Sequence, residues 1–593
     1  MKQKTGRILQ TKGIDYIFVF FALLILGICF RENQYEMRIL QDDISMMILP
    51  AKLAGYNWPN VLDIAMYYGT GYYVLFTPLF ACINDPIVLY NVIIDINIAV
   101  VALCGVLLHY LLCGVLEYKD KWCAAIVSIV SVMIAYFDMG SGLTNEMPIL
   151  LLSILLMILV GQFVKTVSVG KRIFIAIVAI VLSVYSMTIH SRNIVLAVAL
   201  FGVVFLMILL QNKNDDNRYF AMLCMVEFLG FSYLMYKFVP ELIASGVYSA
   251  SEESGTMWNQ EITMRASTFD FEFINNVWTL FVGNVVASIK NTYGLILVSY
   301  ILMIKLAWTY IKLLFNIPQK GKGRTEEEIF QSKAVEYVFV FSAVCYVLGL
   351  LGLSVTWAGM PRGTGYWRYY GTYSSGMIAV SFMYMVQNKL ALNKIKKRTS
   401  ILTAVLLCCF FVWVLPFLND TEYLDTWFVY SCFESIGGVP GFLLTVLVFV
   451  VGIAIIFWTR SKPVLWFAVC FFAIQTISEF GGGHLTSIEA NSKCDTGYKL
   501  IQELEKTQSY NAVYFTGSDS AYMAYQYMML DKPVFRGVPG DAEGVLVFSN
   551  LKNAIESGGW YRVKIDSNEY VYSRDPEMLE MIYSVMENIE GAK

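Results

Sequence analysis

The sequence predicts a polytopic α-helical membrane protein with a small extracytoplasmic α/β domain at its C-terminus. Hydrophobic residues make up 57% of the 593 residues and charged residues only 15%, whereas a soluble protein of this length needs more polar surface. Apolar stretches long enough to cross a bilayer recur as far as residue 478. After Gly481–His484 the hydropathy drops and the charge rises. We therefore divide the chain into a transmembrane domain, residues 1–480, and a C-terminal domain, residues 481–593.

Roughly thirteen apolar segments are candidate transmembrane helices. The first follows the basic segment MKQKTGRILQTK without a small-residue cleavage site, so we expect an uncleaved helix. The segment 271–290 is expected to be an outer amphipathic helix, with an extra span as the alternative. The candidate spans lie near residues 14–30, 87–112, 122–137, 147–164, 173–189, 194–210, 219–239, 292–311, 334–357, 371–387, 399–418, 438–459 and 463–478.

The distribution of lysine and arginine gives the orientation. With the N-terminus in the cytoplasm, the cytoplasmic segments hold roughly 23 Lys and Arg residues, against roughly eight in the outer loops before residue 480. This asymmetry predicts a multi-pass protein of the cell membrane with a cytoplasmic N-terminus. The odd number of spans places the C-terminal domain outside the cytoplasm.

The C-terminal domain has the residue pattern of a small α/β fold. NAVYFTG, KPVFRG and GVLVFSN read as strands, SDSAYMAYQYMML reads as a helix, and YRVKIDSNEYVYS reads as a strand or hairpin. The domain shows no catalytic constellation, so it is expected to bind the acceptor or to form a structural cap.

Four polar clusters lie at the predicted outer ends of the spans. Acids and bases collected at one membrane surface suggest a site there. The clusters are Asp42 with Asp43; Asp138, Asn145 and Glu146 in DMGSGLTNEMP; His190 and Arg192 in IHSRN; and Arg362, Arg368, Tyr369 and Tyr373 in MPRGTGYWRYYGTY.

Each cluster also has a plain structural interpretation. The acidic pair could simply be solvated, and Glu146 could favour a helix N-terminus that Thr144 or Asn145 caps. His190 and Arg192 could be interfacial anchors, and Arg368 could snorkel among tyrosines. It is less probable that all four structural explanations apply together on one face than that any one of them applies alone. Asp95, inside the second span, favours a hydrogen-bonded structural role beside Asn91 and Asn97.

These motifs resemble the GT-C superfamily of polytopic glycosyltransferases, and most closely its bacterial branch related to protein mannosyltransferases and aminoarabinose transferases. The resemblance covers residues 1 to about 390. It is carried by the first outer loop, with its acidic pair, the amphipathic helix ISMMILPAKLAGY and the stretch YYGTGYYVLFTPLF, followed by TNEMP, IHSRN and WRYY. The family usually has Asp-Glu or a similar pair where this chain has Asp42-Asp43.

The resemblance implies a transferase that takes a sugar from a polyprenyl-phosphate-linked donor and passes it to an outer hydroxyl acceptor, with inversion in a single displacement. Asp42 would be the general base, and Asp43 would position the acceptor or share that role. Glu146 would be a supporting acid or a metal ligand. The residues that would bind the donor phosphate are His190, Arg192, Arg368 and Tyr369.

No cofactor is required by the sequence, although a divalent metal could bind to hard oxygen ligands. The candidate metal ligands are Asp42, Asp43, Asp138 and Glu146. The expected partners are the lipid-linked donor, membrane lipids and a glycan, lipid or protein hydroxyl in cell-envelope assembly, with no nucleic acid.

A transporter or flippase of lipid-linked saccharides is the main alternative, and a non-catalytic assembly partner is a third interpretation. A transporter should carry its charges near mid-membrane along a pathway, whereas these charges collect at helix ends. It is also often built from internal repeats, and none is evident here.

Overall fold

The computed structural model describes most of the first 390 residues and most of the C-terminal segment. The described residues are 13–29, 41–59, 71–136, 145–210, 229–230, 233, 271–292, 296–314, 330, 332–358, 367–387, 499–504, 506, 510–540, 544–555, 559–566 and 569–591. The predicted spans at 399–418, 438–459 and 463–478, and most of 219–239, lie outside this set.

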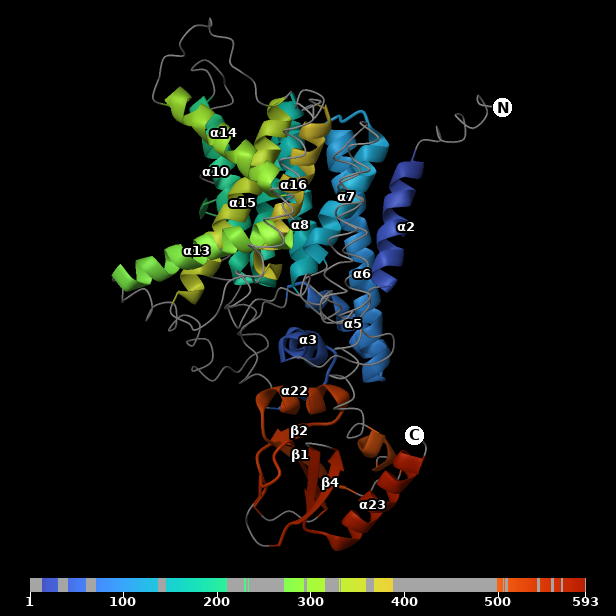
Figure 1. Ribbon diagram of the computed structural model, residues 1–593. Coiled ribbons are helices and arrows are strands. Elements are labelled where there is room, and N and C mark those ends of the chain that lie inside the picture. Colours follow the sequence, from blue (N-terminus) through green and yellow to red (C-terminus); the bar gives the residue numbers. More distant parts are fainter. Residues whose placement is uncertain are drawn as a thin grey trace, which may run out of the picture.

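Helices form a bundle from the N-terminus to residue 387 (Figure 1). Every predicted span within the described residues coincides with one of them. The helices are α2 (Ile14–Cys29), α3 (Gln41–Leu53), the 3₁₀ turn η1 (Tyr73–Phe76), α5 (Thr77–Cys82), α6 (Pro86–Tyr110) with its π-helical continuation η2 (Leu111–Val115), α7 (Lys121–Tyr136), α8 (Glu146–Lys165), α9 (Val169–Ile189), the short turn η4 (Ser191–Asn193), α10 (Ile194–Leu210), α13 (Phe271–Asn291), α14 (Ile296–Leu314), α15 (Lys333–Trp357) and α16 (Arg368–Gln387).

Length and composition single out 4 helices that could cross a membrane within the described part of the chain. They are Pro86–Val115, Glu146–Lys165, Val169–Ile189 and Lys333–Thr356. Helix α13 lies across the bundle rather than along it (Figure 1), and its Trp278 is 64% exposed. This orientation favours an interfacial helix over an extra span.

Local sequence sets the helix boundaries. Asp85 caps α6 by accepting hydrogen bonds from the backbone N–H groups of Ile87 and Val88, at 2.8 and 2.9 Å, and Pro86 occupies the first helical position. The close crossing of α2 and α6 needs Gly105, because a Cβ there would lie 2.0 Å from Cδ1 of Leu23. Asp95 of α6 is exposed, whereas the nearby Asn97 is 1% exposed and accepts a hydrogen bond from the Tyr72 hydroxyl at 2.8 Å.

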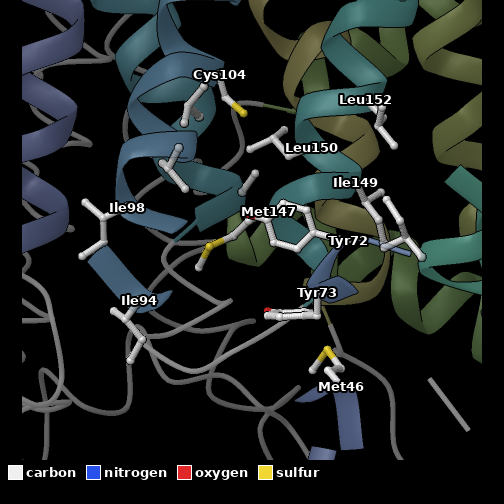
Figure 2. Close-up of a cluster of buried hydrophobic side chains, with 14 of the residues drawn as sticks. Met46, Tyr72, Tyr73, Ile94, Ile98, Cys104, Met147, Ile149, Leu150 and Leu152 are labelled. Atoms are coloured by element: carbon white, nitrogen blue, oxygen red, sulfur yellow. The ribbon is translucent and has the colours of Figure 1, made fainter. Parts of the chain in front are cut away.

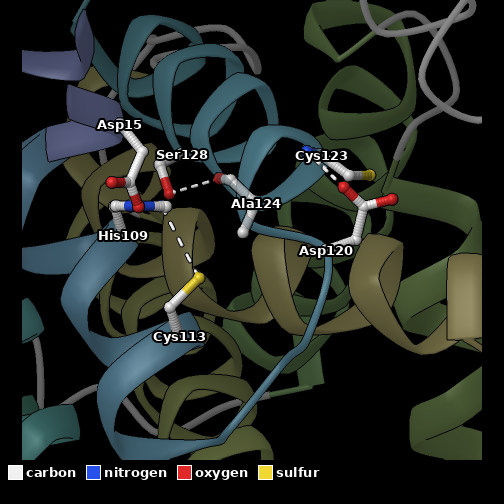
Figure 3. A network of polar contacts seen from close by, with 7 residues as sticks. All are labelled: Asp15, His109, Cys113, Asp120, Cys123, Ala124 and Ser128. Carbon is white, nitrogen blue, oxygen red and sulfur yellow. Dashed lines mark hydrogen bonds and ion pairs between the residues drawn. The ribbon is translucent and has the colours of Figure 1, made fainter. Parts of the chain in front are cut away.

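A polar contact ties α2 to α6 near the start of α2. Nε2 of His109 lies 2.8 Å from Oδ2 of Asp15, and both side chains are buried. Sγ of Cys113 lies 3.9 Å from Nδ1 of the same histidine (Figure 3). The pair fixes the register of the first helix against the second.

The C-terminal segment forms a five-stranded mixed sheet with strand order β2-β1-β3-β5-β4. The strand β1 pairs in parallel with β2 and β3, while β5 pairs antiparallel with β3 and β4. YRVKIDSNEYVYS therefore forms the β4–β5 hairpin. The strands are β1 (Ala512–Thr516), β2 (Val534–Arg536), β3 (Val545–Ser549), β4 (Tyr561–Asp566) and β5 (Glu569–Ser573), with helices α22 (Asp519–Met528) and α23 (Pro576–Gly591).

Helix α22 docks the sheet onto α3 and the start of α6 (Figure 1). Nε1 of Trp58 donates to the Leu530 carbonyl at 2.9 Å, and the buried Tyr527 hydroxyl donates to the Pro86 carbonyl at 3.2 Å. The Tyr522 hydroxyl donates to the carbonyl of Pro59. We call the end of the bundle that carries α3 and these strands the sheet end.

Candidate functional site

The predicted catalytic acids lie in the first turn of α3. Asp42 and Asp43 are the second and third residues of that helix, and their side chains lie outside the described part of the structure. One turn later, Met46 is buried and lies beside Tyr73 (Figure 2). Tyr72 and Met147, which lies at the start of α8, belong to the same cluster of buried hydrophobic side chains. The helix that carries the acids thus approaches the start of α8 through the tyrosines of the first loop.

The end of the first loop is fixed to the end of α9. The backbone N–H of Gly71 donates to the Thr188 carbonyl at 3.0 Å, and the Tyr185 hydroxyl donates to the Gly71 carbonyl at 2.6 Å. A Cβ at Gly71 would lie 2.1 Å from Oγ1 of Thr188. Only glycine allows this close approach. Gly71 therefore contacts Thr188, which lies two residues before His190 in the sequence.

Glu146, Arg192 and Tyr369 meet at the sheet end. Nη2 of Arg192 donates to Oε1 of Glu146, and the guanidinium lies over the Tyr369 ring, 4.7 Å from its centroid. The side chains of Arg192 and Glu146 are only 16% and 8% exposed. Three helix ends far apart in the sequence, those of α8, α9 and α16, are thereby joined by one cation.

Arg192 retains unused hydrogen-bonding capacity. Its Nε and Nη1 are buried and have no hydrogen-bond partner among the described residues, although a guanidinium carries five N–H donors. Burial alone would lower the pKa of Arg192, but the Glu146 carboxylate outweighs it and holds the pKa above its ordinary value. Arg192 is thus a charged side chain with three unsatisfied N–H groups, which is the arrangement that binds an anion.

His190 is a neutral imidazole. Burial, followed by the charge of Arg192, lowers the pKa of His190 to about 3. Its Nδ1 accepts a hydrogen bond from the backbone N–H of Arg192 at 3.2 Å, so the proton of the neutral ring must be on Nε2. At physiological pH His190 can donate a hydrogen bond to a phosphate oxygen but adds no positive charge.

A buried scaffold holds the Arg192 turn. Oδ1 of Asn193 accepts a hydrogen bond from the Tyr373 hydroxyl at 2.9 Å, and its Nδ2 donates to the Ser186 carbonyl at 2.7 Å. Nε1 of Trp367 donates to the Ile134 carbonyl at 2.9 Å and fixes the start of α16 against α7. These bonds pre-position the arginine and the tyrosine ring before any ligand binds.

Asn145 precedes α8 at the N-cap position but does not cap the helix. Its backbone has φ −76° and ψ −8°, which is helical rather than extended, and its side chain makes no capping bond. The residue is 2% exposed, and neither Nδ2 nor Oδ1 has a partner within the described structure. The sequence-based alternative in which Asn145 caps the helix above Glu146 is therefore wrong.

Several predicted site residues cannot be placed. Asp138 and Arg362 lie outside the described residues, and so does the side chain of Arg368, whose backbone begins α16. Within the described part of the chain no group of three or more His, Cys, Asp or Glu side chains could hold a metal, so the metal ligand set remains a prediction.

The structure brings Glu146, His190, Arg192 and Tyr369 together, while the roles that the sequence motifs suggest for them remain predictions. Sequence reasoning assigned no role to Asn193 or Gly71, and it gave Asn145 only the role of a possible helix cap. All three lie in motifs that were singled out, TNEMP, IHSRN and YYGTGYY. Their closeness in sequence to predicted site residues was therefore the signal that could have identified them.

Comparison with known proteins identifies the fold. No family model matches the sequence, and no curated protein matches it. The structure of ArnT from Cupriavidus metallidurans bound to undecaprenyl phosphate is similar, with a TM-score of 0.55 and 12% identity over 96% of this chain and 99% of that one. The apo state of the same ArnT gives a TM-score of 0.52 at 12% identity, with the same coverage. The chain therefore shares the fold of ArnT, in agreement with the resemblance that the sequence motifs show.

Proposed function

We propose that this protein is a membrane glycosyltransferase that moves a sugar from a polyprenyl-phosphate-linked donor to a hydroxyl acceptor on the extracytoplasmic side. The observation that carries the proposal is Arg192, a buried cation with three N–H donors that have no partner among the described residues. It lies at one end of a bundle whose fold resembles that of an ArnT bound to undecaprenyl phosphate. A lipid-linked phosphate held there would have its reacting carbon at the membrane surface.

The chemistry is an inverting displacement. The acceptor oxygen attacks the anomeric carbon and forms the new glycosidic bond, while Asp42 takes the hydroxyl proton. The bond between the anomeric carbon and the phosphate oxygen breaks, and its electron pair stays on the phosphate. Asp43 positions the acceptor or shares the role of base.

The leaving phosphate gains negative charge, which the N–H groups of Arg192 and the Nε2–H of His190 stabilise. Because Arg192 and Glu146 together carry no net charge and His190 is neutral, the phosphate needs a further cation. Arg368 is the best candidate, since it adjoins Tyr369, whose ring contacts Arg192. Glu146 holds Arg192 in place, and a divalent metal could assist through Asp42, Asp43, Asp138 and Glu146.

We assign residues 1–480 to the catalytic transmembrane domain, with about 13 spans, and residues 481–593 to an extracytoplasmic α/β domain. The contacts of α22 with Trp58 and Pro86 support a role of the second domain in holding the first loop. A cell-envelope glycan, lipid or protein would supply the acceptor hydroxyl.

Glycoside formation by the purified protein in detergent, supplied with polyprenyl-phosphate sugars, tests the proposal. Asp42→Asn should lower turnover about a hundredfold or more, since general-base help is worth about 10² to 10⁴. Asp43→Asn should have a smaller effect, and the opposite ranking would exchange the two roles. Glu272→Gln, at an exposed acid of α13, is the matched control. Near-parental transfer by the Asp42→Asn/Asp43→Asn double variant would refute the mechanism, and a transporter would make no glycoside at all.

A further inference from the structure

We propose that Asn145 forms the donor-sugar subsite and binds a sugar hydroxyl through both atoms of its amide. This inference rests on the proposed function, because it assumes that a lipid-phosphate sugar occupies the pocket beside Arg192. It adds a recognition residue for the sugar itself, next to the groups that bind phosphate.

Asn145 is a buried amide that the described part of the protein does not satisfy. It is 2% exposed, and its Nδ2 and Oδ1 have no partner among the described residues. It occupies the N-cap position of α8 without capping the helix, so the usual structural role of an asparagine at this position does not explain it. Leaving a buried polar group unpaired costs about 1–3 kcal/mol, and a ligand would remove that cost.

Asn145 directly precedes a residue of the proposed phosphate site in the chain. The next residue, Glu146, binds Nη2 of Arg192, whose Nε and Nη1 are also buried and unpaired in the described structure. Met147, one residue further, belongs to the same buried cluster as Tyr72 of the first loop (Figure 2). The inference therefore places the amide and the guanidinium, both without a partner among the described residues, against one ligand at the start of α8.

Hydrogen-bond chemistry separates the roles of these two groups. Arg192 offers only donors, and the phosphodiester of a polyprenyl-phosphate sugar offers only acceptors, so the two match. Oδ1 of Asn145 needs a donor, which a phosphodiester lacks. A sugar hydroxyl both donates and accepts, so it can satisfy Oδ1 and Nδ2 together.

The test is to measure the affinity of the purified protein for two kinds of lipid. One is undecaprenyl phosphate, and the other is undecaprenyl phosphate carrying glucose, mannose or galactose. The parental protein should bind at least one sugar-bearing lipid more tightly than undecaprenyl phosphate. Asn145→Ala should weaken that binding about tenfold and leave the affinity for undecaprenyl phosphate unchanged.

Two further variants keep the result interpretable. Asn145→Ser retains a residue favoured at helix N-termini and should show the same selective loss, which separates recognition from misfolding. Ser153→Ala, at another buried and unpaired polar group of α8, is the matched control and should leave both affinities unchanged.

The inference is overturned if Asn145→Ala weakens the binding of both kinds of lipid equally, or if it weakens the binding of neither, as a bridging water would predict. It is also overturned if the parental protein does not prefer any sugar-bearing lipid over undecaprenyl phosphate. Arg192→Ala distinguishes these outcomes from failure of the proposed function. If Arg192→Ala weakens the binding of undecaprenyl phosphate and Asn145→Ala does not selectively weaken the binding of sugar-bearing lipids, only the sugar subsite is wrong. If Arg192→Ala has no effect either, the phosphate site and the proposed function fail with it.

Discussion

Replacing Arg192 by alanine should damage stability and ligand binding by separate routes. The variant leaves the Glu146 carboxylate, 8% exposed, without its cationic partner. Removing one member of a buried ion pair costs about 3–5 kcal/mol of folding free energy. The loss should shrink at acidic pH, because an unpaired buried carboxylate can take up a proton and become neutral.

The ligand-binding loss should be of a different size. A hydrogen bond between charged groups contributes about 1.5–3 kcal/mol, which corresponds to roughly a 10- to 150-fold weaker affinity for undecaprenyl phosphate. Lysine should restore only part of it, because an ammonium lacks the planar fork of the guanidinium and stacks less well on the Tyr369 ring.

The double variant Arg192→Ala/Glu146→Gln separates the two effects. Both buried charges are then gone, so most of the lost stability should return. The affinity should stay low, since the N–H donors are still missing. Thermal unfolding in detergent and binding of undecaprenyl phosphate are the two measurements. Arg172→Ala is the control, because Arg172 also lies over an aromatic ring, that of Phe163, but near the start of α9. If the double variant recovered its affinity together with its stability, Arg192 would be a structural residue only.

Four other outcomes are expected. Arg368→Ala should lose far more transfer activity than Arg362→Ala, since Arg368 adjoins Tyr369, and equal near-parental rates would remove Arg368 from the site. Trp58→Phe loses the 2.9 Å hydrogen bond to the Leu530 carbonyl and should lower turnover several-fold without changing donor affinity. Trp308→Phe, on an exposed face of α14, should change neither turnover nor donor affinity. A Trp58→Phe variant that changed donor affinity alone would contradict this prediction. The pKa of His190 is about 3 in the folded protein and about 6.5 when unfolded, so the unfolded state binds more protons between these pH values and His190 should lower stability as the pH falls through this window. His190→Gln should therefore make the unfolding midpoint less sensitive to acid. Identical pH profiles of the two proteins would mean that the histidine protonates normally. Cysteines introduced at Asn60 and Asn568 should be labelled in intact cells, and labelling only after permeabilisation would invert the proposed topology.

Apolar segment length predicts the helices of the first 390 residues well. The segments expected at 87–112 and 147–164 became α6 and α8 with ends shifted by a few residues, because length and hydropathy are local properties. The same holds for β1, β2 and β3, whose apolar runs are bounded by turn residues. Several predicted spans lie outside the described residues, so the predicted number of spans remains a prediction.

Long-range pairing and protonation could not be read from the sequence. Arg368 was the expected cation among the tyrosines, yet Arg192 lies over the Tyr369 ring, and nothing local to residue 192 specifies a partner at 369. The neutral state of His190 follows from its burial, which depends on the packed bundle. TNEMP suggested Thr144 or Asn145 as a cap; the helical backbone angles of Asn145 prevent the capping geometry there, and Thr144 lies outside the described residues.

The first loop is held at both of its described ends, and by parts of the chain that are distant in sequence. At one end Gly71 bonds to Thr188 and Tyr185 of α9, and at the other Trp58 bonds to Leu530 beyond α22. Helix α3, with Asp42 and Asp43 in its first turn, leads directly into this loop. A general base acts only within hydrogen-bond reach of the proton that it removes, so the proposed base must be fixed relative to the proposed phosphate site. The α9 contact supplies that reference, because the same helix end continues into His190 and Arg192. The α22 contact restrains the opposite side of the loop, so the C-terminal sheet should influence turnover without touching the donor.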